Sequence, residues 1–269
     1  MATRIVGVLN VTPDSFSDGG RFRSVGDAVA AGLAMVDEGA DWLDVGGEST
    51  RPACVPVSEA EEIARVVPVI RELAAGLEGR VRLSVDTYKA GTAHAALAAG
   101  ATAINDVSGG LLDPGILAVA AAGRVALVLG HLRGQPTDMQ ADVHFDDVVE
   151  EVSTELASRV AEARSAGCSE IWADPGIGFG KHLAHNLRLL KHLARVRARL
   201  GVPVMVGVSR KRFVGDLTGK PTKERIFGTA AAVAVAITNG ADAIRVHDVP
   251  AMRDVVQVAE AIARAGEVD

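Results

Sequence analysis

The chain of 269 residues contains little cysteine, few aromatic residues and no long apolar run. Its two cysteines, Cys54 and Cys168, match no zinc or redox spacing, so we expect both to be reduced and structural. No apolar stretch approaches the ~18–20 residues of a membrane helix, and the first residues lack the layout of a secretion signal. These features favour a cytoplasmic enzyme with no membrane partner.

The charge and composition narrow the class of protein further. A net charge of −6 gives no basic excess with which to coat nucleic acid. Aromatic residues make up 3% of the chain and hydrophobic residues 48%, so Ala, Val, Leu and Ile must fill the core. That composition suits parallel strands alternating with helices. There is no linker or break in composition, and we expect a single domain spanning residues 1–269.

Eight apolar runs rich in β-branched residues recur along the chain, separated by segments of helical periodicity. The predicted strands are Ile5–Asn10, Trp42–Val45, Val81–Asp86, Ala103–Asp106, Ala126–Gly130, Ile171–Asp174, Pro203–Val208 and Ala243–Val246. The predicted helices include Val25–Glu38, one capped by Ser58, Asp147–Gly167, Asn186–Leu200, Thr229–Asn239 and Met252–Ala265. This alternation predicts an α/β fold, a single (β/α)₈ barrel with its active site at the carboxyl ends of the strands.

Nearly every predicted strand ends in a small polar cluster, which a core does not need. An open doubly wound sheet would gather ligands at one switch point and would not explain polar tips on all the strands. Asp86, Asn105 and Asp174 follow three of the apolar runs. Taken singly, each is better explained as a helix cap. Around one barrel mouth, the three favour a pocket for a flat heterocycle that presents several N–H donors.

The first two strand ends and the last two carry different chemistry. Asn10 opens a long polar loop, which is also typical of plain turns, and Gly46-Gly47 precede Arg51 in a loop that could hold an anion. The GxxxxGK[ST] pattern of a phosphate loop is missing from the sequence. Arg245 and His247 share one side of their strand, where barrels often bind phosphate. A solvated basic surface is the alternative.

Three further features of the sequence stay open. The basic group 210–212 could bind a small anion. His131 ends the fifth strand, where a structural histidine is as consistent with the position as a catalytic one. No HExxH or clustered Cys/His pattern indicates zinc.

Seven of these stretches, in this order, resemble the dihydropteroate synthase family. They are NVTPDSFSDGG, DVGGESTRP, SVDT, INDVSGG, DPGIGFGK, VSRK and RVHDV, and the likeness runs from Gly7 to about Val249. The resemblance implies a (β/α)₈ barrel, expected as a homodimer, whose small-molecule substrates are 4-aminobenzoate and (7,8-dihydropterin-6-yl)methyl diphosphate. The products would be 7,8-dihydropteroate and diphosphate, for folate synthesis.

The resemblance also implies a role for each matching residue. Mg²⁺ would be the cofactor, bound by Asn10 together with the diphosphate. The catalytic residues would be Asp86, Asp174, Lys211, Arg245 and His247. The pterin would be held by Asp86, Asn105, Asp174 and Lys211, and the diphosphate by Thr50, Arg245 and His247. The aminobenzoate site would be bordered by Phe16, Ser49, Arg51, Pro52, Phe179 and Lys211.

The chain departs from the family pattern at a few positions. Ala53-Cys54 follow Arg51-Pro52 where Gly-Ala is usual, Arg212 stands where Ser is common, and Leu132 replaces the usual Met after His131. These changes put aminobenzoate affinity and sulfonamide response in question, but not the reaction. The folate-binding barrel of corrinoid methyltransferases is one alternative, and a non-catalytic pterin-binding barrel is another. The first would give no joint role to Asn10, Thr50, Lys211, Arg245 and His247.

Overall fold

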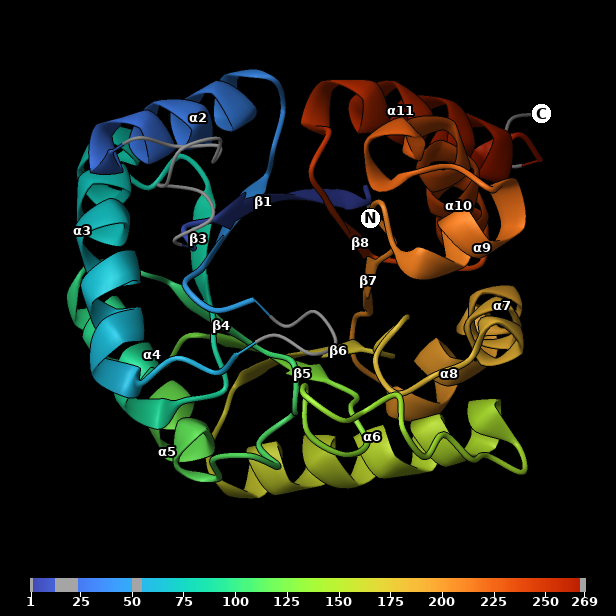
Figure 1. The fold of residues 1–269 in the computed structure, drawn as a ribbon, viewed down its shortest axis with the longest axis horizontal. Helices are drawn as coiled ribbons and strands as arrows, with labels where there is room; N and C mark the ends of the chain where they lie inside the picture. Colours follow the sequence, from blue (N-terminus) through green and yellow to red (C-terminus); the bar gives the residue numbers. More distant parts are fainter. Residues whose placement is uncertain (1, 13–23, 50–54, 267–269) are drawn as a thin grey trace.

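The computed structural model describes residues 2–12, 24–49 and 55–266. Its strands form one parallel sheet in the order β6-β5-β4-β3-β2-β1-β8-β7. A single bridge, Ala173 to Val204, joins the two edges and closes the barrel that the sequence predicts (Figure 1). The strands are β1 (Arg4–Asn10), β2 (Trp42–Gly46), β3 (Arg82–Asp86), β4 (Ala103–Asp106), β5 (Ala126–Gly130), β6 (Glu170–Asp174), β7 (Met205–Gly207) and β8 (Ala243–Val246).

Helices surround the barrel on all sides in Figure 1. They are α2 (Val25–Asp37), α3 (Glu59–Leu77), α4 (Ala90–Ala98), α5 (Gly115–Gly123), α6 (Val148–Ser165), α7 (Leu183–Lys191), α8 (Leu193–Leu200), α9 (Arg212–Thr218), α10 (Ile226–Thr238) and α11 (Val249–Arg264). Within the described ranges, none of them combines the length and apolar character needed to cross a bilayer.

The predicted Ser58 cap is confirmed, and a glycine follows each of three other helices. Ser58 caps α3 by accepting a hydrogen bond from the Glu61 amide at 3.2 Å. Gly39, Gly100 and Gly240 follow α2, α4 and α10 with φ values of 109°, 114° and 94°. A side chain would be strained at such angles, so glycine lets the chain turn directly from each helix into the next strand.

Apart from shifts of a few residues at the ends of elements, three features differ from the prediction. The segment predicted as one helix over 186–200 is split into α7 and α8 at His192, whose ψ of 23° is not helical. No proline or glycine marks this break in the sequence. The short helix α9 follows β7 and was not predicted. Strand β7 is shorter than expected because Val204 meets β6 through one bridge and lies outside the regular ladder.

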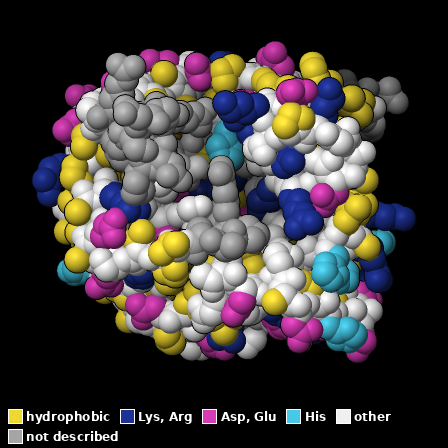
Figure 2. Space-filling model, in the orientation of Figure 1, with side chains coloured by type: hydrophobic (Ala, Val, Ile, Leu, Met, Phe, Trp, Pro, Cys, Tyr) yellow, Lys and Arg dark blue, Asp and Glu magenta, His cyan; other side chains and the backbone are white. Residues whose placement is uncertain are grey.

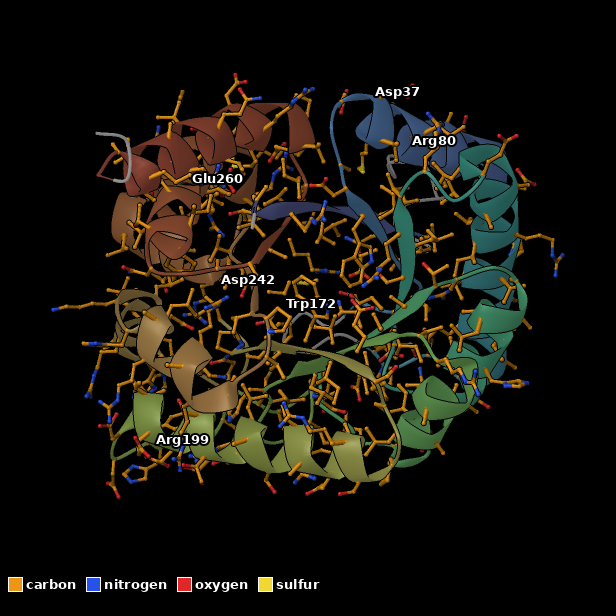
Figure 3. The ribbon with its side chains drawn as sticks, turned by 180° about the vertical axis from the view of Figure 1, so that it is seen from behind. Asp37, Arg80, Trp172, Arg199, Asp242 and Glu260 are labelled. Carbon is orange, nitrogen blue, oxygen red and sulfur yellow. The ribbon has the colours of Figure 1, made fainter. Side chains whose placement is uncertain are left out.

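Alternation along the strands builds two separate cores. Leu43 and Val45 face the helices in the larger one. Trp42 faces the barrel interior and packs edge-to-face on Trp172, with ring centroids 5.8 Å apart. Seen from behind, Trp172 lies near the middle of the barrel (Figure 3). This aromatic base fills the amino-terminal part of the interior, so the polar side chains above it open toward the carboxyl ends of the strands.

Candidate active site

A small pocket, partly open to solvent, lies where the carboxyl ends of the strands converge. Figure 2 shows this face, with Lys and Arg side chains gathered beside the central hollow. The structure brings six of the predicted site residues together here, on five strand ends and loops. The lining residues are Asp86, Asn105, Val107, Gly130, Asp174, Gly176, Phe179, Gly207, Lys211 and Arg245.

Strand register explains why these side chains meet. Asp86 pairs with Asn105, so both stand at the same height and point inward. On the neighbouring strands β5 and β6, Gly130 pairs with Asp174, and on β7 and β8, Gly207 pairs with Arg245. A Cβ on Gly207 would lie 3.6 Å from the Lys211 ammonium nitrogen and 3.8 Å from Asp174 Oδ2. The glycine therefore leaves open the space between an acid and a base.

Arg245 forms a buried ionic network at the floor of the pocket. Its Nε donates to Asp44 Oδ2 and its Nη2 donates to Asp86 Oδ2, both at 2.6 Å. The Asn105 amide donates to the same Asp44 oxygen at 2.8 Å. Asp44 is fully buried and was not predicted as a site residue. A carboxylate at the inward-facing middle position of the apolar run WLDVG was the signal that could have identified it.

The network sets the charges of its members. Burial raises the pKa of Asp86 to about 7, against the lowering effect of Arg245. Burial lowers the pKa of Arg245, but Asp44 and Asp86 more than reverse this and raise it overall. Arg245 therefore stays cationic, whereas Asp86 lies close to its titration point near neutral pH.

An acid and a base face each other on the opposite side of the pocket. Asp174 accepts a hydrogen bond from the Gly176 amide at 2.7 Å, and burial raises its pKa while Lys211 lowers it. The Lys211 ammonium donates to the Ile177 carbonyl and lies 4.4 Å from the centroid of the Phe179 ring. Burial lowers the pKa of Lys211 to about 8, although Asp174 opposes the shift.

The basic group 210–212 is divided by the structure. Arg210 has a φ of 57° and turns away to pair with Asp248, with Nε 2.9 Å from Oδ2. Arg212 is exposed and lies 3.6 Å from Asp216. Lys211 alone of the three reaches the pocket, so the three do not form one anion site.

The other predicted residues lie around this pocket or outside the described ranges. His247 follows β8 with its Nδ1 2.9 Å from the Ser209 hydroxyl, and it does not line the pocket. Ser49 lies in the connection after β2. Four further predicted residues lie outside the described ranges: Phe16, Thr50, Arg51 and Pro52.

Asn10 ends β1 beside Gly46, its partner in the ladder. A Cβ on Gly46 would lie 3.5 Å from both Asn10 Oδ1 and Asp86 Oδ2, so the two oxygens flank one point. In the described part of the chain, no group of three His, Cys, Asp or Glu residues could hold a metal. Mg²⁺ commonly takes one or two protein oxygens together with substrate phosphates and water. The donors present therefore fit an ion bound along with a diphosphate rather than a closed metal centre.

His131, whose role the sequence left open, lies beneath the pocket and is buried. Its Nδ1 lies 2.9 Å from the ammonium nitrogen of Lys181, a second buried residue that the sequence analysis did not single out. Burial lowers the pKa of His131 to about 4, so the ring is neutral. The lysine ending the GFGK stretch was the available signal for Lys181.

Together, the closed parallel barrel and the buried acids, amide and cations at its mouth define a barrel enzyme that binds a small polar heterocycle. The family model "Pterin binding enzyme" matches residues 6–247. A dihydropteroate synthase of Synechocystis is 44% identical over 97% of this chain and 91% of the relative. The chain belongs to the dihydropteroate synthase family, transferases of folate synthesis.

Solved structures agree with this family. Dihydropteroate synthase of Xanthomonas albilineans, solved with 4-aminobenzoic acid, has a TM-score of 0.89 and 48% identity, over 97% of this chain and 93% of that chain. The same enzyme in complex with 7,8-dihydropteroate has a TM-score of 0.85 and 45% identity, over 97% of this chain and 94% of that chain. These likenesses establish the fold and the family of this chain.

Proposed function

We propose that this chain joins (7,8-dihydropterin-6-yl)methyl diphosphate to 4-aminobenzoate, forming 7,8-dihydropteroate and releasing diphosphate. The observation that carries this proposal is the convergence of Asp86, Asn105, Asp174 and Lys211 on one pocket at the barrel mouth. A pterin edge offers several N–H donors and a carbonyl acceptor. Two carboxyls, an amide and an ammonium supply the complementary groups.

The same residues suit a dissociative substitution. As the C–O bond to diphosphate breaks, the pterin methylene gains positive charge, which the ring delocalises. The buried carboxyls of Asp86 and Asp174, bound to the ring N–H groups, stabilise that charge in a site of low dielectric. The amine of aminobenzoate is a weak neutral nucleophile, so forming a strong electrophile first is the favourable route. No covalent bond to the protein is needed.

The leaving group requires positive charge at the same mouth. Arg245 and His247, with Thr50, would contact the diphosphate, and Arg245 is already held in place by its two carboxylates. Mg²⁺, held by Asn10, would supply further neutralisation of the diphosphate. Phe179 and Lys211 would border the aminobenzoate, together with Phe16, Ser49, Arg51 and Pro52.

A homodimer is consistent with the surface of the last two helices. Among the described residues, four of the exposed large apolar side chains lie on α10 and α11: Phe227, Val235, Val258 and Ile262. Apolar side chains on neighbouring helices are typical of an interface between subunits. We also propose that the enzyme acts in the cytoplasm.

The reaction is tested by mixing the protein with both substrates, with and without Mg²⁺, and following diphosphate and dihydropteroate together. We expect equal amounts of the two products and a strong loss of rate without the ion. Tight pterin binding without diphosphate release would instead support a non-catalytic binding barrel. A pterin–protein adduct trapped during turnover would exclude the dissociative route.

Replacing Asp174 with asparagine should weaken pterin binding by about 10-fold or more while leaving the fold intact. The substitution keeps the shape but removes a charged acceptor, and hydrogen bonds to charged groups contribute about 1.5–3 kcal/mol. Calorimetry would measure the affinity, and circular dichroism would check the fold. Unchanged affinity in a folded variant would place the pterin elsewhere.

A further inference from the structure

Lys181 is a buried lysine beneath the pocket that none of the steps above uses. It is 3% exposed and does not line the pocket. Its ammonium nitrogen lies 2.9 Å from His131 Nδ1 and donates to the Phe179 carbonyl at 2.9 Å and the His131 carbonyl at 3.3 Å. An ammonium group has three protons, and here each has an acceptor. The contacts therefore suit the charged form in one fixed position.

His131 fixes this position from the other side. Since Nδ1 accepts from Lys181, the ring proton sits on Nε2, which lies 3.0 Å from Glu155 Oε2. Glu155 is partly exposed and is also held by Arg133, with Nε 3.1 Å from Oε1. A chain of contacts thus runs from the buried ammonium to the outer surface of α6.

The ammonium lies beside Gly176, whose amide binds Asp174. The amide of Gly176 donates to Asp174 Oδ1 at 2.7 Å, and a Cβ on Gly176 would lie 3.1 Å from the Lys181 nitrogen. Three cations act on this carboxyl and lower its pKa against the effect of burial: Lys211, Arg245 and Lys181. Of the three, Lys211 and Arg245 line the pocket, where substrate binding will change their surroundings.

The charges around Lys181 are mixed. Burial lowers its pKa to about 7, and Lys211 and Arg133 act in the same direction. Asp174 is the largest opposing influence, and Glu155 also raises the pKa. The ammonium and the Asp174 carboxylate therefore stabilise each other's charged forms, and removing either changes the titration of the other.

We propose that Lys181 is a positioning residue of the pterin site, whose ammonium stabilises the Asp174 carboxylate and fixes the Phe179 carbonyl without touching substrate. The inference rests on the proposed binding of pterin by Asp174. It gives His131 the role of the neutral acceptor that orients Lys181. It also explains why a lysine is buried beneath a pocket that already contains Lys211.

The test is the pH dependence of 7,8-dihydropteroate affinity, measured from pH 5 to 9 in wild type, Lys181→Met and Lys181→Gln. Without the ammonium, the pKa of Asp174 rises further, so Asp174 takes up its proton at a higher pH. As the pH is lowered, the affinity of each variant should therefore begin to fall at a higher pH than the affinity of wild type; this fall is the acid limb of the profile. We expect this limb to move up by about one pH unit in both variants, since a nearby opposite charge shifts a carboxyl by about 1–3 units. Gln can still donate to the Phe179 carbonyl, which separates the effect of charge from that of the hydrogen bond.

His131→Asn is the matched control. Its side-chain oxygen can replace Nδ1 as the acceptor for Lys181 while the contact with Glu155 is lost, so the limb should stay at the wild-type pH. Asp86 also titrates near neutrality but is common to all four proteins. A uniform loss of affinity at every pH, or failure of both Lys181 variants to fold, would reject the assignment in favour of a purely structural role. Wild type that binds no pterin would instead refute the proposed function.

Discussion

Replacing Arg245 with methionine should lower the free energy of unfolding by about 3–5 kcal/mol at pH 7 and abolish turnover. The guanidinium bridges Asp44 and Asp86, each at 2.6 Å. Its loss leaves two buried carboxyls without their cation, which is the costly way to break a buried ion pair. Urea unfolding followed by circular dichroism measures the loss, and diphosphate release measures the turnover.

The pH dependence of that loss tests its electrostatic cause. Burial already raises the pKa of Asp86 to about 7 in the presence of Arg245, and the variant should raise it further. The folded variant then binds more protons than the unfolded chain above about pH 4, so its stability should increase as the pH falls from 7 toward 5. Adding Asp44→Asn to Arg245→Met should recover part of the stability at pH 7, because it removes one uncompensated charge.

Arg199→Met on α8 is the control, since Arg199 is exposed. It should change stability by no more than about 0.5 kcal/mol. An Arg245→Met protein as stable as this control at pH 7 would show that the two carboxyls do not need the guanidinium. The ionic floor of the pocket would then have no structural role.

The barrel could be predicted from sequence because its signals are local. An apolar run predicts a strand, and a glycine after a helical segment predicts the end of a helix, as at Gly39 and Gly240. Both signals lie in a few neighbouring residues. Asp86, Asn105 and Asp174 could be predicted for the same reason, as polar residues directly after apolar runs. The break at His192 was missed because no proline or glycine marks it in the sequence.

The partners of these residues could not be predicted, because they depend on register across several strands. Asp44 and Asp86 meet through Arg245, which is 201 positions from Asp44 along the chain. Lys181 and His131 meet across 50 positions. A sequence pattern assigns each of them to a strand end or loop, but which charges neutralise one another is decided by the closed barrel.

Replacing Lys211 with methionine should reduce kcat/KM by about 100-fold while leaving the fold intact. The ammonium is a charged contact in a buried pocket, and such a contact contributes about 1.5–3 kcal/mol, which is a factor of about 10–150. Steady-state kinetics in both substrates would measure the change. Lys220→Met, on the exposed segment before α10, is the control and should be close to wild type.

The Lys211→Met variant should also change how the free energy of unfolding depends on pH between about 8 and 10. Burial lowers the pKa of Lys211 to about 8 from an unfolded value of 10.5. Between these values the unfolded chain binds more protons, so wild-type stability should rise as the pH increases from about 8 to 10. The Lys211→Met variant lacks this contribution, so its stability should rise less steeply with pH. The buried Lys181 would supply the rise that remains. Near-wild-type turnover together with an unchanged slope of stability against pH would show that Lys211 neither holds substrate nor is desolvated. Its assignment to the site would then be wrong.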